Sequence, residues 1–217
     1  MRNLLLLTGV LLAFLFAMTY LGIANDPDTG APDTAMAGMG ASANVELVTG
    51  ISFLIFAAVM HGNFTIREYK SRTILQMFTY PLGRGTMILA KEAAVWLFIF
   101  AAGVLSKLVI YGVLLLGSRW RTPDFPLDYS LAEGIFYERL LLGSAVTASV
   151  SLIALGVGFW MKSSKAVLVA SLLLAVVMQG NIGGATLSTS PALPAVLLGA
   201  SALAAALTVE RARREEI

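Results

Sequence analysis

The segment Glu68-Tyr-Lys-Ser-Arg-Thr-Ile-Leu-Gln-Met-Phe-Thr-Tyr-Pro-Leu-Gly-Arg84 separates two long apolar stretches, residues 47–64 and 93–116. Each stretch is long enough to cross the roughly 30 Å hydrocarbon core of a bilayer, which takes about 17 to 25 helical residues. Because the segment between them is charged and polar, we expect it to lie in water between two membrane-spanning helices. A soluble partner could act on the membrane-embedded part of the chain through this segment.

Composition extends this interpretation to the whole chain. Of the 217 residues, 58% are hydrophobic and 13% are charged, and the mean hydropathy is +0.81, whereas soluble domains carry about 25% charged residues. The apolar runs do not alternate in polarity as the strands of a membrane barrel would. We therefore expect an all-α polytopic membrane protein. Its single transmembrane domain, residues 1–217, would have six transmembrane helices at residues 4–24, 47–64, 93–116, 140–161, 166–185 and 192–208.

The distribution of positive charge predicts the orientation of these spans. Lys and Arg are enriched in cytoplasmic loops, and with a cytoplasmic N-terminus 11 of the 15 positive residues fall inside. The sequence thus predicts that both termini are cytoplasmic, an N-in/C-in arrangement. The inside positive residues are Arg2, Arg67, Lys70, Arg72, Arg84, Lys91, Lys162, Lys165, Arg211, Arg213 and Arg214.

Signatures of catalysis are missing from the sequence. It contains no phosphate loop, no G-x-S-x-G elbow and no H-E-x-x-H helix, and it has no Cys and a single histidine, His61. We expect His61 to be a packed or interface residue, and we predict no catalytic residue, no metal site and no cofactor on this chain. The net charge of +2 also argues against nucleic acid as a partner.

The polar segment itself predicts a short helix. Ser71 or Thr73 can accept hydrogen bonds from the first turn, and Pro81 ends the helix because it has no N–H and restricts the preceding residue. The helix, about residues 74–79, would expose apolar side chains in a water-facing stretch. Such residues mark either a membrane-surface helix or a protein docking helix, and the residues alone favour neither. They are Ile74, Leu75, Met77 and Phe78.

A resemblance to a known family favours docking. The residues Glu68, Thr73-Ile74-Leu75-Gln76, Pro81-Leu82 and Arg84 resemble the cytoplasmic loop after the second helix in permease subunits of type-2 ATP-binding-cassette (ABC) transporters. The resemblance implies that residues 66–92 form the coupling segment, whose short helix docks on a separate ATPase subunit. The coupling residues would be Glu68, Thr73, Ile74, Leu75, Gln76, Met77, Phe78, Pro81 and Arg84.

The same resemblance implies the partners and the activity. Two copies of a cytoplasmic ABC ATPase would bind ATP and Mg, and a second permease chain, identical or different, would complete the transporter. The expected function is ATP-driven export of a drug, an antimicrobial peptide or a lipid-like substrate by alternating access, as a multi-pass protein of the bacterial plasma membrane. Two other classes stay open: a membrane immunity or assembly protein that works without ATP, and an intramembrane enzyme. Recovery of an ATPase subunit with the chain would separate the first class from both.

Lys107 is the one charged residue well inside an apolar segment. A lysine at mid-bilayer costs about 2.5 to 3.5 kcal/mol on insertion scales, so something must offset its charge. One alternative is that the side chain reaches the outer headgroups or pairs with another residue. The other is that Lys107 faces an aqueous pathway, where it would attract anionic groups.

Overall fold

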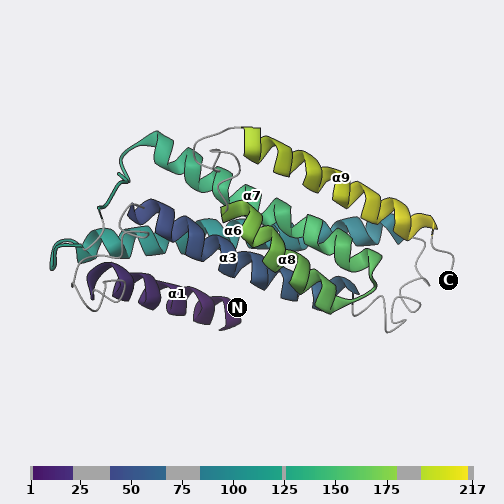
Figure 1. The fold of residues 1–217 in the computed structure, drawn as a ribbon, viewed down its shortest axis with the longest axis horizontal. Coiled ribbons are helices and arrows are strands. Elements are labelled where there is room, and N and C mark those ends of the chain that lie inside the picture. Colours follow the sequence, from purple (N-terminus) through teal and green to yellow (C-terminus); the bar gives the residue numbers. More distant parts are fainter. Residues whose placement is uncertain (1, 22–39, 67–83, 124–125, 180–191, 215–217) are drawn as a thin grey trace. The chain divides into compact units, whose positions relative to one another are not determined.

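The computed structural model is built from helices (Figure 1), and it describes residues 2–21, 40–66, 84–123, 126–179 and 192–214. No strand occurs in these ranges, which confirms the all-α prediction. The elements are α1 (Arg2–Tyr20), α3 (Ala41–His61), the π-helix η1 (Gly62–Ile66), α6 (Arg84–Gly117), α7 (Gly134–Trp160), α8 (Ser164–Gln179) and α9 (Ala192–Arg214).

Five of the described helices are long and apolar enough to cross a membrane. They contribute residues Asn3–Tyr20, Ala41–Ile66, Gly85–Gly117, Gly134–Trp160 and Leu193–Arg211. The remaining helix, α8, is apolar but has only 16 residues, and residues 180–185 of the predicted fifth span lie outside the described ranges. The chain is therefore a polytopic all-α membrane protein. Its N-in/C-in orientation stays a prediction.

Four helices extend well beyond the predicted apolar segments: α3, α6 and α7 at their N-terminal ends and α9 at its C-terminal end. α3 begins at Ala41 rather than near residue 47, so Glu46 is helical, and α6 begins at Arg84, so residues 84–92 of the predicted coupling segment are helical as well. Hydropathy detects only the part of a helix that is continuously apolar, and a helix with polar ends is longer than that part.

Contacts divide the chain into two compact units. Unit 1 consists of Met1–Gly50 and Ala102–Gly143. Within it α1 packs on the second half of α6: the Thr8 and Ser106 hydroxyls are 2.8 Å apart, and the buried Tyr20 hydroxyl donates to the Leu114 carbonyl. These side-chain bonds satisfy polar groups at membrane depth, where no water would do so.

Unit 2 consists of Ile51–Ala101 and Ser144–Ile217. One of its apolar clusters joins Leu54 of α3 to Val146 and Val150 of α7, together with residues of α8 and α9. A second cluster joins α3, η1, α7 and α8 through Ala58, Ile66, Ala154, Leu155, Val167 and Ala170. Ala is the smallest of these side chains, and small residues allow helices to approach closely in a membrane.

The turn from α7 to α8 has the hydrogen bonding of a Schellman motif. Lys162 adopts a left-handed conformation with φ of 48°. The Ser163 N–H donates to the Gly158 carbonyl at 3.1 Å and the Lys162 N–H to the Phe159 carbonyl at 3.2 Å. These bonds satisfy carbonyls that the end of a helix leaves unpaired, and Ser163 then accepts a bond from the Ala166 N–H at 3.1 Å. Within unit 2 the turn fixes the hairpin of α7 and α8.

Candidate functional site

The residues predicted to contact the ATPase lie almost entirely outside the described ranges. Arg84 is the exception, and it begins α6. The coupling role of the segment therefore stays a prediction from sequence. The residues outside the described ranges are Glu68, Thr73, Ile74, Leu75, Gln76, Met77, Phe78 and Pro81.

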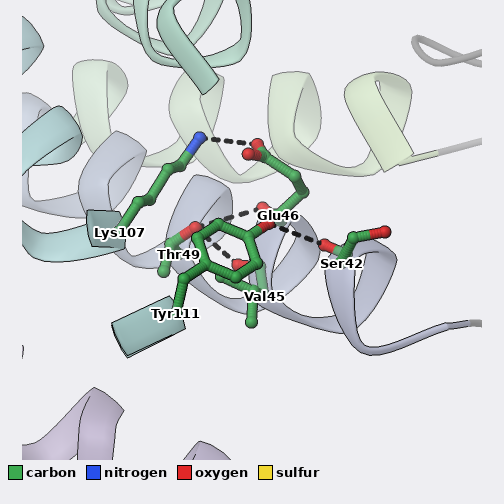
Figure 2. Close-up of polar contacts among 6 residues, drawn as sticks. All are labelled: Ser42, Val45, Glu46, Thr49, Lys107 and Tyr111. Carbon is green, nitrogen blue, oxygen red and sulfur yellow. Dashed lines mark hydrogen bonds and ion pairs between the residues drawn. The ribbon is translucent and has the colours of Figure 1, made fainter. Parts of the chain in front are cut away.

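Lys107 is paired with an acidic residue inside unit 1. Its side chain is only 2% exposed, and its Nζ lies 2.5 Å from Oε2 of Glu46 on α3 (Figure 2). Glu46 itself is 38% exposed. A charge-assisted hydrogen bond of this kind offsets much of the cost of placing an ammonium group at membrane depth. The pair thus links α3 to α6 through opposite charges.

A glycine of α7 makes room for this ion pair. A Cβ atom added at Gly143 would lie 2.8 Å from Glu46 Oε2 and 3.4 Å from Lys107 Nζ. Real Cβ atoms essentially never approach a heavy atom to less than 3.0 Å, so a larger residue would displace the carboxylate. In unit 1 the two charges therefore lie directly against the backbone of α7.

The hydroxyl groups of Thr49 and Tyr111 lie beside the ion pair and are bonded to carbonyls of α3 (Figure 2). The Thr49 hydroxyl donates to the Val45 carbonyl at 2.5 Å, and the Tyr111 hydroxyl of α6 donates to the Ser42 carbonyl at 3.3 Å (Figure 2). Both carbonyls belong to the first turns of α3. Tyr111 thereby attaches α6 to α3 a second time, about one helical turn from Lys107.

The N-terminus of α3 is capped by the loop between α6 and α7. Asp128 accepts from the Ser42 N–H at 2.8 Å and from the Ser42 hydroxyl at 2.5 Å, and the Ala41 N–H donates to the Pro126 carbonyl at 3.0 Å. The first N–H groups of a helix have no partner within the helix, and a carboxylate near them also interacts favourably with the helix dipole. Asp128 therefore acts as the N-cap of α3, a role that a side chain at the N-terminus of the same helix commonly has.

Aromatic side chains continue this contact. The rings of Tyr111, Tyr129 and Phe136 lie with centroids 4.6 to 6.0 Å apart, and the Tyr129 hydroxyl donates to the Tyr111 carbonyl at 3.1 Å. Burial raises the pKa of Tyr129, and the charges of Tyr20 and Asp128 raise it further. The hydroxyl consequently keeps its proton and remains a donor at any physiological pH. No pattern in the sequence predicts the contact between this loop and α3.

This arrangement defines what the site can do. Lys107 is buried and compensated, so an anionic group could reach it only if Glu46 moved. Glu46, by contrast, is more than one third exposed inside a candidate membrane span, and an ionised carboxylate does not face lipid without a large cost. The sequence signal for Glu46 was its position directly before an apolar segment. The signal is weak, because the predicted apolar segment begins at residue 47, one position after Glu46.

Comparison with known proteins identifies the family of this chain. The profile of the ABC-2 family transporter proteins matches residues 2–180. A relative from Bacillus subtilis (strain 168), named "Uncharacterized protein YcbO", is 40% identical over 58 residues. That match covers 27% of this chain and 25% of the relative, so the chain spans about a quarter of the relative's length. No solved structure matches.

Proposed function

Because the chain belongs to the ABC-2 transporter family, we propose that it is the permease subunit of an ATP-driven exporter and that residues 66–92 couple it to a separate ATPase. Membership in the family makes the chain a membrane transporter subunit, in agreement with its five span-length helices. The observation that carries the proposal is the extent of the family match. It includes the coupling segment as well as the helices on both sides of it.

The proposed roles of the two kinds of subunit are supported by the sequence. The chain has no phosphate loop, so ATP and Mg would bind to the partner, with two ATPase copies and two permease chains in the complete transporter. ATP-driven closure of the ATPases would push on the helix at residues 74–79. The helices connected to it would tilt as rigid bodies, which is a common form of switching between two states. Both chain termini would lie on the ATPase side.

The cargo is proposed only as a class. A drug, an antimicrobial peptide and a lipid-like molecule all suit an apolar membrane domain. If Lys107 lines the pathway, its ion pair with Glu46 must open for an anionic group to bind, since Lys107 has little exposed surface of its own. Loss of transport in Lys107→Leu, with normal expression, would support a pathway role, and unchanged transport would exclude it.

The coupling role can be tested with Phe78→Asp. Burying a phenylalanine at an interface contributes about 1.5 to 3 kcal/mol, and the substitution would also place an unpaired carboxylate there. We expect the affinity for the ATPase subunit to fall by about tenfold or more, with the amount of protein in the membrane unchanged. The measurement is co-purification of the ATPase with the tagged full chain, together with the ATP hydrolysis of the recovered complex.

Trp120→Asp is the matched control. Trp120 is 93% exposed and follows α6 at the end opposite to the coupling segment, so the same change of aromatic to acid should leave ATPase binding intact. If Phe78→Asp instead lowered the membrane level of the chain while the remaining protein held the ATPase normally, the helix would be a lipid-surface element. The coupling proposal would then be wrong.

A further inference from the structure

A second polar site lies in unit 2, and the proposed function does not use it. Within the described part of the chain, four buried side-chain atoms lack a hydrogen-bond partner: Nδ1 of His61, Oγ1 of Thr65 and both carboxyl oxygens of Glu92. These side chains are 0%, 3% and 2% exposed. A buried polar group without a partner costs free energy, and a buried unpaired charge costs more. Three such residues in one unit require an explanation.

Glu92 lies on the face of α6 that contacts α7. It lies one helical turn from Ile88 and one from Trp96, on the same face of α6. Ile88 packs against Phe159 of α7, and the Trp96 indole N–H donates to the Ser149 hydroxyl of α7 at 3.0 Å. Glu92 therefore lies between two residues that contact α7, at the level of residues 149–159.

His61 faces the same stretch of α7 from α3. Its Nε2 lies 3.2 Å from the Ser151 hydroxyl oxygen, and Ala58, one turn earlier, packs with Ala154 and Leu155. α3 and α6 also touch each other, since the rings of Phe56 and Phe98 have centroids 6.4 Å apart. The two helices thus bring His61 and Glu92 to one level beside α7. Directly after His61 the chain forms the π-helix η1, a rare element that is frequent at functional sites.

The hydrogen bonds of Ser151 determine which nitrogen of His61 carries the proton. The Ser151 hydroxyl donates its only hydrogen to the Ala148 carbonyl at 2.6 Å. Its oxygen can then only accept from His61, so Nε2 is the protonated nitrogen. In the neutral imidazole Nδ1 is left as an acceptor. An ionised Glu92 would add two further acceptors. The site would then hold three acceptor atoms and no donor that could bond to them.

Other titratable groups on the packed elements are few. The unit 2 part of α7 carries none. The unit 2 part of α3 and η1 carry only His61, and the unit 2 part of α6 carries Arg84, Lys91 and Glu92. On α8 the one titratable residue is Lys165, which is exposed, and α9 carries Glu210 and several arginines at its C-terminal end. None of these groups is bonded to Nδ1 or to the Glu92 carboxyl among the described residues.

We propose that His61 and Glu92 form a proton-binding site in which one proton, taken up from water, is shared between the Glu92 carboxyl and His61 Nδ1. Uptake adds the proton to the carboxylate, removes its negative charge and supplies the missing donor, so that the O–H of Glu92 donates to Nδ1. A rotation of one or both side chains completes the bond. This site is separate from the Lys107–Glu46 ion pair, and it does not depend on transport or on ATP coupling.

The single histidine makes the test direct. With ¹⁵N-labelled histidine, the full chain in lipid nanodiscs gives the imidazole signals of His61 alone. We expect Nε2 to carry a hydrogen and Nδ1 to accept a hydrogen bond. Glu92→Leu should move the ¹⁵N chemical shift of Nδ1 to the value of an acceptor that receives no hydrogen bond. Raising the pH should produce the same change in the unchanged chain. Glu133→Gln, an exposed acid in the loop before α7, should change nothing.

A second variant keeps the test valid if Glu92→Leu fails to fold. Gln at position 92 always has an amide N–H to donate, so Glu92→Gln should hold Nδ1 hydrogen-bonded at every pH. A proton residing on Nδ1 and bonded to Glu92 would equally support the site, provided that Glu92→Leu abolishes it. The proposal is overturned if the Nδ1 chemical shift is the same in the unchanged chain and in Glu92→Leu, as it would be for a water-bridged histidine. It is also overturned if this chemical shift responds to Na⁺ rather than to pH.

Discussion

Lys107 and Glu46 contribute unequally to the stability of unit 1. Lys107 is 2% exposed and Glu46 is 38% exposed, so the two single substitutions leave the remaining charge in different surroundings. Without Glu46, a buried ammonium group has no described counter-charge. Without Lys107, the Glu46 carboxylate keeps the exposed surface that it already has. Breaking a buried ion pair from one side costs about 3 to 5 kcal/mol, and only Glu46→Leu should approach that range.

This asymmetry predicts an order of thermal stabilities. In nanodiscs, Glu46→Leu should lower the Tm the most and Lys107→Met should lower it less. The double variant should recover much of the loss, since two apolar residues can replace a buried pair at little cost. Unfolding followed by tryptophan fluorescence gives the comparison. Equal losses in the two single variants, or a double variant that is worse than both, would contradict the role assigned to the pair.

Gly143 supplies a second prediction at the scale of the residue. Gly143→Ala places a methyl group against the Glu46 carboxylate and should lower the Tm by weakening the ion pair. Gly112→Ala is its control, because a Cβ at Gly112 meets nothing within 4 Å, and Ala in a helix gains about 1 kcal/mol over Gly. In the Lys107→Met background the cost of Gly143→Ala should shrink, which a double-mutant cycle measures. Additive effects would show that the glycine serves another purpose.

The sequence predicted that Lys107 needs compensation, but it did not predict the source. Its cost follows from position alone, since a lysine nine residues from the end of an apolar segment is deep in the bilayer. The identity of its partner depends on how α3 and α6 are aligned in space. Hydropathy places the start of the predicted span directly after Glu46, whereas the helix begins at Ala41.

At the scale of the element, the start of α3 depends on the distant loop between α6 and α7. Asp128→Ala removes the acceptor of the Ser42 N–H and hydroxyl and should cost about 1 kcal/mol, as the loss of an N-cap does. Hydrogen exchange should accelerate at residues 41–44 and stay unchanged near the C-terminal end of α3. Asp128→Asn keeps an acceptor and should restore most of the protection. Equal exchange in all three proteins would show that the loop does not cap α3.

The elements themselves were more predictable than their ends. Long apolar runs predicted the helices, because only a helix satisfies its own backbone groups in lipid. Their ends depend on contacts between distant segments, such as Asp128 with α3, and on local geometry such as the left-handed Lys162. In the structure Tyr129 packs on Tyr111 and Phe136, a contact that no periodicity encodes.

For the whole molecule, composition indicates the fold class, a helical membrane protein, and the family match identifies the chain as an ABC-2 transporter protein. The hydrophobic excess leaves a helical membrane protein as the expected fold, and the ABC-2 profile covers residues 2–180. Orientation, export and ATP coupling remain predictions, since they concern a membrane and partner subunits. A His61–Glu92 site could not be foreseen either. The two residues are 31 positions apart in the sequence, and only the packing of α3, α6 and α7 places both of them beside the same stretch of α7.

The central claim is that the segment at residues 66–92 contacts an ATPase subunit, and crosslinking tests it most directly. The chain has no cysteine, so Leu75→Cys carries a unique thiol to which a photoactivatable crosslinker can be attached in native membranes. The account predicts a crosslink from position 75 to a subunit that contains a phosphate loop, and none from Trp120→Cys. A chain that crosslinks to that ATPase from position 120 and not from position 75, or only to lipid from position 75, would contradict it.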